Sequence, residues 1–263
     1  MTIVLNLLRF LPWLIFLLLQ ACQQNNDIRA EQLQKRNEAA SYNTQLGLAY
    51  LKQGDRPRAK RKLLTALDLA PDSADVNVAM AYYLEKTGEV SKAQVFYQKA
   101  LVLAPDSGAQ LNNYGTFLCR LGHYKEAERY FLRAANDIHY IHTAAAYENA
   151  GLCAAAVPDY SKAKHYYLKA LQQDPRRKQA LYELAAIELK EKHASKALEY
   201  MQKYPALSLT DPNILAMGVE AARQAGKRNI EGEYKQRLAR LTNYTDYYTG
   251  AKNEYDSSNG CNS

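Results

Sequence analysis

The feature that most constrains this chain is an internal repeat with a step of 34 residues. Aligned on itself with that step, the chain places alanine in the same two columns of successive units, and a third column holds only glycine or alanine. After the third unit the step lengthens once to 36 residues and then returns to 34. The columns are Ala59, Ala93, Ala127, Ala163 and Ala197; Ala66, Ala100, Ala134 and Ala170; and Gly47, Ala81, Gly115, Gly151 and Ala185. Such self-similarity predicts a stack of similar small units.

Each unit has the pattern of two helices joined by a turn. Apolar residues recur at helical spacing in residues 42–52 and 74–86, a break follows at Gly54 or Gly88, and a second helical pattern begins. Proline follows the second helix because it cannot continue one. We expect the small residues of the columns to lie where two helices cross closely. We expect large residues to fill the gap to the next unit, at Leu63, Tyr97, Phe131, Tyr167 and Met201.

This pattern resembles the tetratricopeptide repeat, a helix-turn-helix with small residues at three fixed positions and proline near its end. The resemblance implies an all-α fold, a right-handed superhelical solenoid of about six repeats. The repeats span residues 40–73, 74–107, 108–143, 144–177 and 178–210, with a degenerate sixth at 211–241. Between the third and fourth repeats, Asn136-Asp137-Ile138-His139 stands where the other turns carry proline, so the two additional residues must lie there.

A different kind of segment precedes the repeats, with residues 11–24 reading LPWLIFLLLQACQQ. The unbroken apolar stretch from Leu11 to Leu19 is nine residues long, whereas a membrane-spanning helix needs about twenty. A secretory signal has a basic start, an apolar stretch of roughly 7–15 residues and small residues at its cleavage site. Arg9 and Ala21 supply the first and last of these features, so we expect a signal peptide over residues 1–21. An uncleaved signal anchor is the alternative.

The end of that segment, Leu19-Gln20-Ala21-Cys22, resembles the bacterial lipobox. The resemblance implies that the Cys22 thiol receives a diacylglycerol, that the chain is cut before it, and that the new amino terminus is acylated. Several acyl chains anchor a protein stably where one would not. In Gram-negative bacteria an aspartate after the cysteine retains many lipoproteins at the inner membrane, so Gln23 indicates the outer membrane.

The combination of lipobox, polar linker and repeats resembles the PilF/PilW family, the lipoproteins called pilotins of type IV pili. The resemblance covers residues 19–240, and Leu111-Asn112-Asn113-Tyr114-Gly115 is among the segments that carry it. It implies a signal peptide (1–21), a polar linker from lipidated Cys22 (22–37) and a repeat domain (38–241). The residues beyond Leu241 are polar and lack a helical period, so we expect a disordered tail (242–263). The resemblance also implies a protein anchored by lipid to the periplasmic face of the outer membrane, where it binds the secretin PilQ and promotes its localisation and multimerisation. The alternative function is a periplasmic adaptor that tethers a peptidoglycan-active enzyme or another secretory complex.

Enzymatic function is not expected, because catalytic groups would have to break the repeat columns. His139 and His142 are spaced as metal ligands on one helical turn could be, but no cysteine or carboxylate cluster accompanies them. Cys119 has no histidine in its segment to activate it as a nucleophile. The predicted mature chain has 33 Lys+Arg and 27 Asp+Glu, interspersed along its length, so no nucleic acid partner is expected. Nor do we expect a cofactor, a metal or a small-molecule substrate.

The predicted binding surface is a groove lined by the first helix of each repeat, as the tetratricopeptide resemblance implies. We expect it to hold an apolar or amphipathic segment of the partner. Leu48 and Tyr82 are its main apolar candidates, although both could instead be packing residues. The predicted groove residues are Thr44, Leu48, Leu51, Val78, Tyr82, Glu85, Asn112, Thr116 and Arg120.

A disulfide between Cys119 and Cys153 is the last prediction from the repeat register. Export would place the chain in an oxidising compartment, and Cys22 is assigned to lipid. Cys119 is the twelfth residue of the third repeat and Cys153 the tenth of the fourth, so both lie on first helices that are neighbours in the stack. The alternative is two buried, inert thiols. Cys261, in the polar tail, would be a free or intermolecular thiol.

Overall fold

The structure is a computed structural model that describes residues 29–242, and these residues form helices and turns without a strand. The all-α prediction is therefore confirmed for this part of the chain. The signal peptide, the lipidation of Cys22 and the thiol of Cys261 fall outside the described residues. No helix of the described part is long and apolar enough to cross a membrane.

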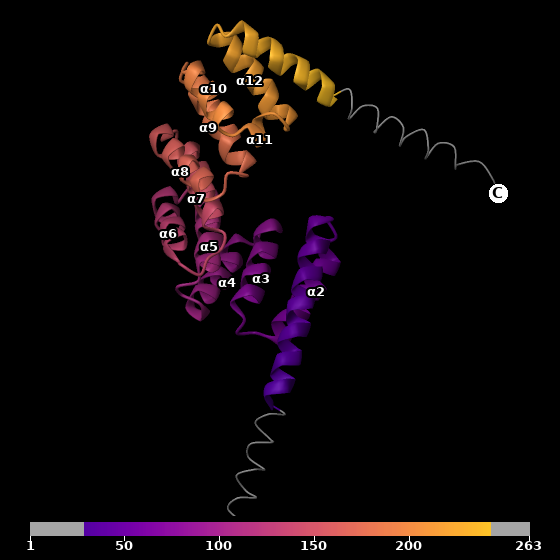
Figure 1. Ribbon diagram of the computed structural model, residues 1–263. Helices are drawn as coiled ribbons and strands as arrows, with labels where there is room; N and C mark the ends of the chain where they lie inside the picture. Colours follow the sequence, from indigo (N-terminus) through magenta and orange to yellow (C-terminus); the bar gives the residue numbers. More distant parts are fainter. Residues whose placement is uncertain (1–28, 243–263) are drawn as a thin grey trace, which may run out of the picture. The chain divides into compact units, whose positions relative to one another are not determined.

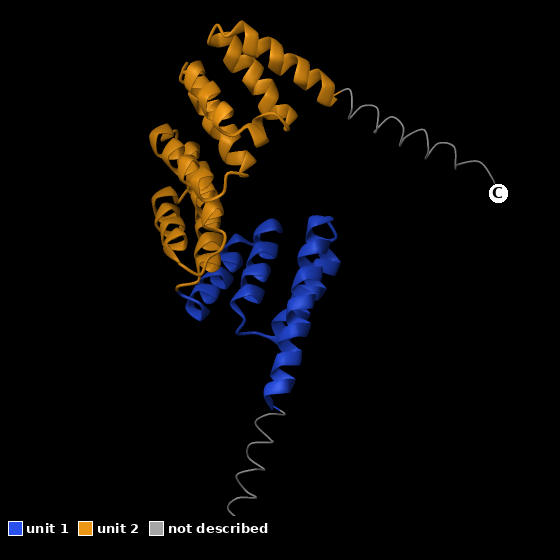
Figure 2. Cartoon of the chain, viewed as in Figure 1, with its two compact units in different colours: residues 1–105 blue, residues 106–263 orange. Residues whose placement is uncertain are grey.

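The described helices fall into two compact units, residues 1–105 and 106–263 (Figure 2). Unit 1 contains a helix over residues 29–52, α2 (Arg56–Leu69), α3 (Ala74–Lys86) and α4 (Val90–Leu103) (Figure 1). Unit 2 contains α5 (Gly108–Arg120), α6 (Tyr124–Asn136), α7 (Thr143–Ala156), α8 (Tyr160–Gln173), α9 (Lys178–Lys190), α10 (Ala194–Lys203), α11 (Pro205–Ser208), α12 (Pro212–Gln224) and a helix over residues 228–242. Each predicted repeat thus contains one pair of helices, including the degenerate sixth, and the fifth repeat also contains the four-residue helix α11.

The first helix begins earlier than the sequence pattern suggested. Residues 29–37 are helical, although they were predicted to belong to a polar linker. The sequence there consists of good helix formers, and the ion pair between Glu31 and Lys35 joins neighbouring turns at 2.6 Å. The polar composition of these residues therefore wrongly indicated a linker, because the end of a helix that is exposed to solvent needs no apolar face.

The turns within the helix pairs use a left-handed backbone that favours glycine. Gly54, Gly88, Gly122 and Gly226 have φ angles of 82°, 87°, 84° and 69° at equivalent places. An aspartate then starts two of the second helices, α2 and α8. The Asp55 carboxylate accepts a hydrogen bond from the Arg58 amide at 3.0 Å, and Asp159 accepts one from the Lys162 amide at 3.2 Å. Local sequence thus fixes where each pair turns back on itself.

The small-residue column brings the two helices of a pair into close contact. A Cβ added to Gly47 would lie 2.7 Å from the Leu63 side chain, and one added to Gly115 would lie 3.0 Å from Phe131. We predicted that the large residues fill the gap to the next unit. Leu63 and Phe131 lie against the glycine of their own pair, whereas Met201 lies 3.1 Å from the position of a Cβ added to Gly218 in the next unit. The degenerate repeat follows the same rule with Gly218 and Tyr234. Glycine stands at Gly47, Gly115 and Gly218 because the facing side chain takes the space of a Cβ, whereas Ala81 and Ala185 show that other units of the column accommodate one.

Candidate protein-binding surface

Six of the predicted groove residues lie in unit 1, on helix 29–52 and α3. Leu48, Leu51 and Val78 are half-buried there. Tyr82 is 36% exposed, and the Lys86 ammonium lies 5.3 Å from the centre of its ring. These side chains offer a partner both aliphatic and aromatic surface.

Two further predicted residues of unit 1 make contacts within the protein. The Glu85 carboxylate accepts a hydrogen bond from the Tyr97 hydroxyl at 3.1 Å. The Thr44 hydroxyl donates to the Ala40 carbonyl at 2.8 Å. Thr44 nevertheless lines a hollow of about 880 Å³ between the first half of its helix and the turn from α2 to α3.

That hollow was missed by the sequence analysis. Leu33, Ala40, Leu69 and Val76 give it apolar walls, and Asp72, Asp75 and Arg36 add charge. Leu33 is 59% exposed. The hollow could not be expected while residues 29–37 were assigned to a linker, because those residues form one of its walls.

In unit 2 the predicted groove residues on α5 are joined to α7. The Asn149 amide donates to the Asn112 side-chain oxygen at 3.0 Å and to the Thr116 hydroxyl at 3.4 Å. Asn112 is buried. Asn112 therefore contributes to cohesion between neighbouring repeats more than to an open surface, while Arg120 at the end of α5 is exposed. Asn149 is not among the predicted groove residues. The only sequence signal for it is its place in the repeat register, 36 residues after Asn113.

A disulfide also joins these two helices. Cys119 on α5 and Cys153 on α7 are bonded, with Cα atoms 5.8 Å apart. This separation is ordinary for a disulfide. The structure therefore contains the pairing that the repeat register predicted.

A buried ion pair continues the connection from α7 to α9. Glu148 accepts two hydrogen bonds from the Arg177 guanidinium, at 2.5 and 3.1 Å, and a third from the Ala180 amide at 3.2 Å. Glu148 is buried, so its charge needs these partners. Bidentate pairing of a guanidinium with a carboxylate fixes both the distance between the two side chains and their relative orientation.

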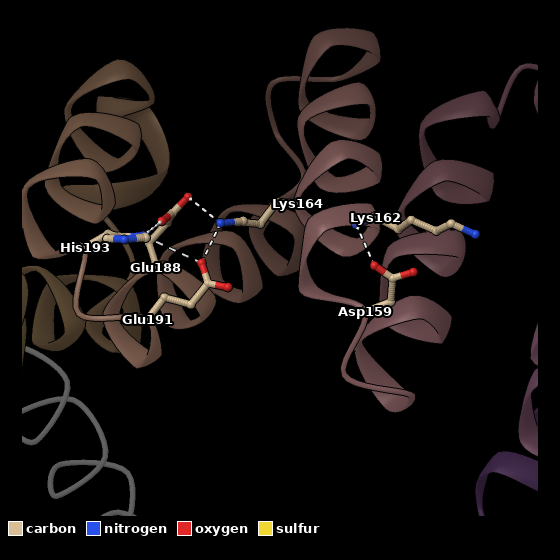
Figure 3. Close-up of polar contacts among 6 residues, drawn as sticks. All are labelled: Asp159, Lys162, Lys164, Glu188, Glu191 and His193. Atoms are coloured by element: carbon tan, nitrogen blue, oxygen red, sulfur yellow. Dashed lines mark hydrogen bonds and ion pairs between the residues drawn. The ribbon is translucent and has the colours of Figure 1, made fainter.

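A second ionic cluster joins α8 to the end of α9 (Figure 3). The Lys164 ammonium lies 3.3 Å from Glu188 and 2.6 Å from Glu191, and the His193 ring lies 3.0 Å from Glu188. Burial disfavours the charge on Lys164, but the hydrogen bonds from its ammonium to Glu191 and Glu188 outweigh this effect and raise its pKa.

The same cluster has the residue types of a metal site. Glu188, Glu191 and His193 offer ligand atoms within 4.8 Å of one another. However, the Lys164 ammonium already lies between the two carboxylates. We interpret the cluster as a structural salt-bridge network. His139 and His142, the histidines weighed from the sequence, lie apart from it in the turn before α7.

Comparison with known proteins identifies the family. Residues 44–108 and 156–212 match the tetratricopeptide repeat family. The type IV pilus assembly protein PilF of Pseudomonas aeruginosa is 31% identical over 232 residues, which cover 87% of this chain and 92% of the relative. The chain belongs to the PilF family.

Solved structures of this family agree with the assignment. The structure described for the functional characterisation of Pseudomonas aeruginosa PilF is 30% identical, with a TM-score of 0.64 and coverage of 84% of this chain and 99% of the other. The crystal structure of PilW, described as a widely conserved type IV pilus biogenesis factor, is 28% identical, with a TM-score of 0.63 and coverage of 79% and 96%. Yeast Tom70, 17% identical with a TM-score of 0.62 and coverage of 78% and 43%, shares the repeat fold.

Proposed function

We propose that this protein acts in type IV pilus biogenesis as a pilotin that binds the secretin PilQ and promotes its localisation and multimerisation. The observation that carries the proposal is the relationship to PilF, a type IV pilus assembly protein, across 92% of the relative's length. Its repeat fold suits the role, because stacked helix pairs present extended surfaces to other proteins.

The protein acts by binding and not by catalysis. The ionic groups that could suggest chemistry have structural partners within unit 2, as shown by Glu148 with Arg177 and Glu188 with Lys164. Each group links helices from different repeats. A side chain held in this way maintains the spacing of the stack.

The partner is held through an apolar or amphipathic segment against unit 1. Leu48 and Tyr82 are half-exposed apolar side chains on predicted inner helices, and the hollow beside Thr44 adds apolar wall. An aromatic residue that is partly exposed can serve as an anchor in a protein interface. This surface is the proposed primary contact with PilQ.

Charged substitutions test this contact directly. Leu48→Asp and Tyr82→Asp should abolish co-purification of PilQ while the circular dichroism spectrum and melting curve stay unchanged. Val95→Asp is the matched control, because Val95 is 63% exposed on the second helix of its pair. Undiminished PilQ recovery with both inner-helix variants would remove this surface from consideration.

Membrane attachment is the other part of the proposal. Acylation at Cys22 would hold the protein at the periplasmic face of the outer membrane, since several acyl chains together give stable anchoring. Cys22→Ser should shift the protein from the outer-membrane fraction and remove the acyl mass from the intact protein. An unchanged mass and location would show that the cysteine is not lipidated.

A further inference from the structure

The turn between α6 and α7 exposes two isoleucines. We call residues 137–142 the isoleucine loop. Ile138 is 90% exposed and Ile141 is 88% exposed, more than any other large hydrophobic residue of the described chain. The two residues by which the third repeat exceeds its neighbours fall in this region. The insertion therefore coincides with an apolar projection that the other turns lack.

The isoleucine loop is held in place by contacts to α5. The Asp137 carboxylate accepts hydrogen bonds from the Gly108 amide at 2.7 Å and from the His139 amide at 2.9 Å. A Cβ added to Gly108 would lie 2.5 Å from Tyr140, so this tyrosine packs directly on the start of α5. The Thr143 hydroxyl donates to the Tyr140 carbonyl at 2.8 Å. The isoleucines are thus displayed by a fixed turn.

Two hollows with charged residues in their lining border the loop. Ile138 borders one of about 330 Å³ with Arg133, Asp106 and Asp137. Ile141 borders another of about 400 Å³ with Asp174 and Arg176 among its lining residues. The Arg176 side chain is 88% exposed and also lies 2.9 Å from Asp174. The loop is therefore an apolar ridge between two hollows that carry both signs of charge.

The exposed isoleucines and the two hollows beside them fit the surface of another protein better than a lipid surface or a second copy of the chain. A flat bilayer would leave the hollows unfilled. Their three carboxylates (Asp106, Asp137 and Asp174) are balanced by three guanidinium groups (Arg133, Arg176 and Arg177), so this surface has no net positive charge to attract anionic lipid. A stable interface that stands alone, such as that of a dimer, buries about 800 Å² per partner. Two isoleucine side chains supply only part of that area, which suits a contact that adds to another one and not a contact that holds a dimer by itself. A folded protein with an apolar pocket and a carboxylate for Arg176 would match both the ridge and the charge.

We propose that the isoleucine loop is a second contact for the secretin, separate from the surface on unit 1. This inference rests on the proposed function. A multimeric ring repeats every surface on each subunit, so one chain with two contacts can hold two neighbouring subunits. Holding them together raises their effective concentration for assembly. The primary contact gives binding, and the loop promotes multimerisation.

The test compares PilQ binding with PilQ multimerisation, using the mature lipidated chain. The variant is Ile138→Asp with Ile141→Asp, which changes exposed residues and leaves the fold intact. The matched control is Val95→Asp with Val102→Asp, at exposed positions on α4. We expect the loop variant to bind the monomeric periplasmic region of PilQ within about twofold of the wild type and to lose formation of multimers on native gels. The control should retain both properties.

Other results would overturn the inference in distinguishable ways. Wild-type multimer yield from the loop variant would show that the loop has no part in assembly, whereas loss of monomer binding would make it the primary contact.

Ile141→Trp provides a direct probe, because Trp13 in the predicted signal peptide is the only native tryptophan. Its emission should shift to shorter wavelength with PilQ. Quenching by brominated lipid in phosphatidylethanolamine–phosphatidylglycerol vesicles, or dimerisation in light scattering, would assign the loop to lipid or to a second copy. Failure of the wild-type chain to bind PilQ would contradict the proposed function itself.

Discussion

Tyr167 lies so close to Gly151 that a Cβ added to the glycine would be 2.6 Å from the tyrosine ring. Tyr167 is fully buried and cannot move aside without opening the core of α7 and α8. Gly151→Ala should therefore lower the free energy of unfolding by about 1–3 kcal/mol, as overpacking of a close contact does. Urea unfolding followed by circular dichroism measures the change.

Gly232→Ala is the control for that substitution. Gly232 lies in helix 228–242, and a Cβ there would meet nothing within 4 Å. The same chemical change should then raise the free energy of unfolding by about 0.5–1 kcal/mol, because alanine is the better helix former. Equal effects at the two positions would mean that the Tyr167 contact is unimportant.

Reduction of the bond between Cys119 and Cys153 should destabilise the protein. The two cysteines are 34 residues apart, and closing a loop of that size in the unfolded chain contributes up to about 3–4 kcal/mol. Reductant should lower the midpoint of urea unfolding of the wild type. The double variant Cys119→Ser, Cys153→Ser should unfold at the same midpoint with and without reductant. If the urea midpoint of the wild type does not change with reductant, the bond adds no stability.

Lys192→Gly should stabilise the protein by about 1 kcal/mol. Lys192 has a φ of 64°, a left-handed conformation that costs other residues roughly 1–2 kcal/mol and costs glycine little. It stands 34 residues before Gly226, where the chain makes the same turn with a glycine. Lys192→Ala is the comparison, since it removes the same side chain and keeps the Cβ. A stability gain shared by both variants would attribute the effect to the lost lysine and not to the backbone.

Acid should weaken the contact at the start of α12. Burial raises the pKa of Asp211, but hydrogen bonds from the Ile214 amide, the Lys178 side chain and the Asn213 amide outweigh this effect, so the pKa is lowered overall. A lowered folded-state pKa stabilises the protein above the unfolded value, about 3.9, and this stabilisation is lost as pH falls through the folded value. Asp211→Asn should therefore destabilise the protein at pH 7 and flatten the fall in stability below pH 4. Parallel pH profiles for the wild type and the variant would contradict this assignment.

The repeat register predicted the helix pairs, the glycine turns and the cysteine pairing, because each depends on spacing that every unit shares. It could not predict contacts that depend on individual side chains. Glu148 pairs with Arg177, 29 residues later in the sequence, and Asn149 donates to Asn112, 37 residues earlier. Neither pair of residues belongs to a column that recurs in the other repeats. The exposure of Ile138 and Ile141 could not be predicted from the repeat pattern either, since an apolar residue in an insertion can be buried or exposed to solvent. The early start of the first helix was missed because polar sequence was equated with linker.

The state of PilQ in cells that lack this chain tests the central claim most directly. Membranes from a deletion strain and from the complemented strain would be compared by quantifying PilQ multimers and monomers on native gels. A pilotin function predicts that multimers disappear or fall sharply without the chain and return on complementation. Equal multimer levels in the outer membranes of both strains would contradict the proposed function.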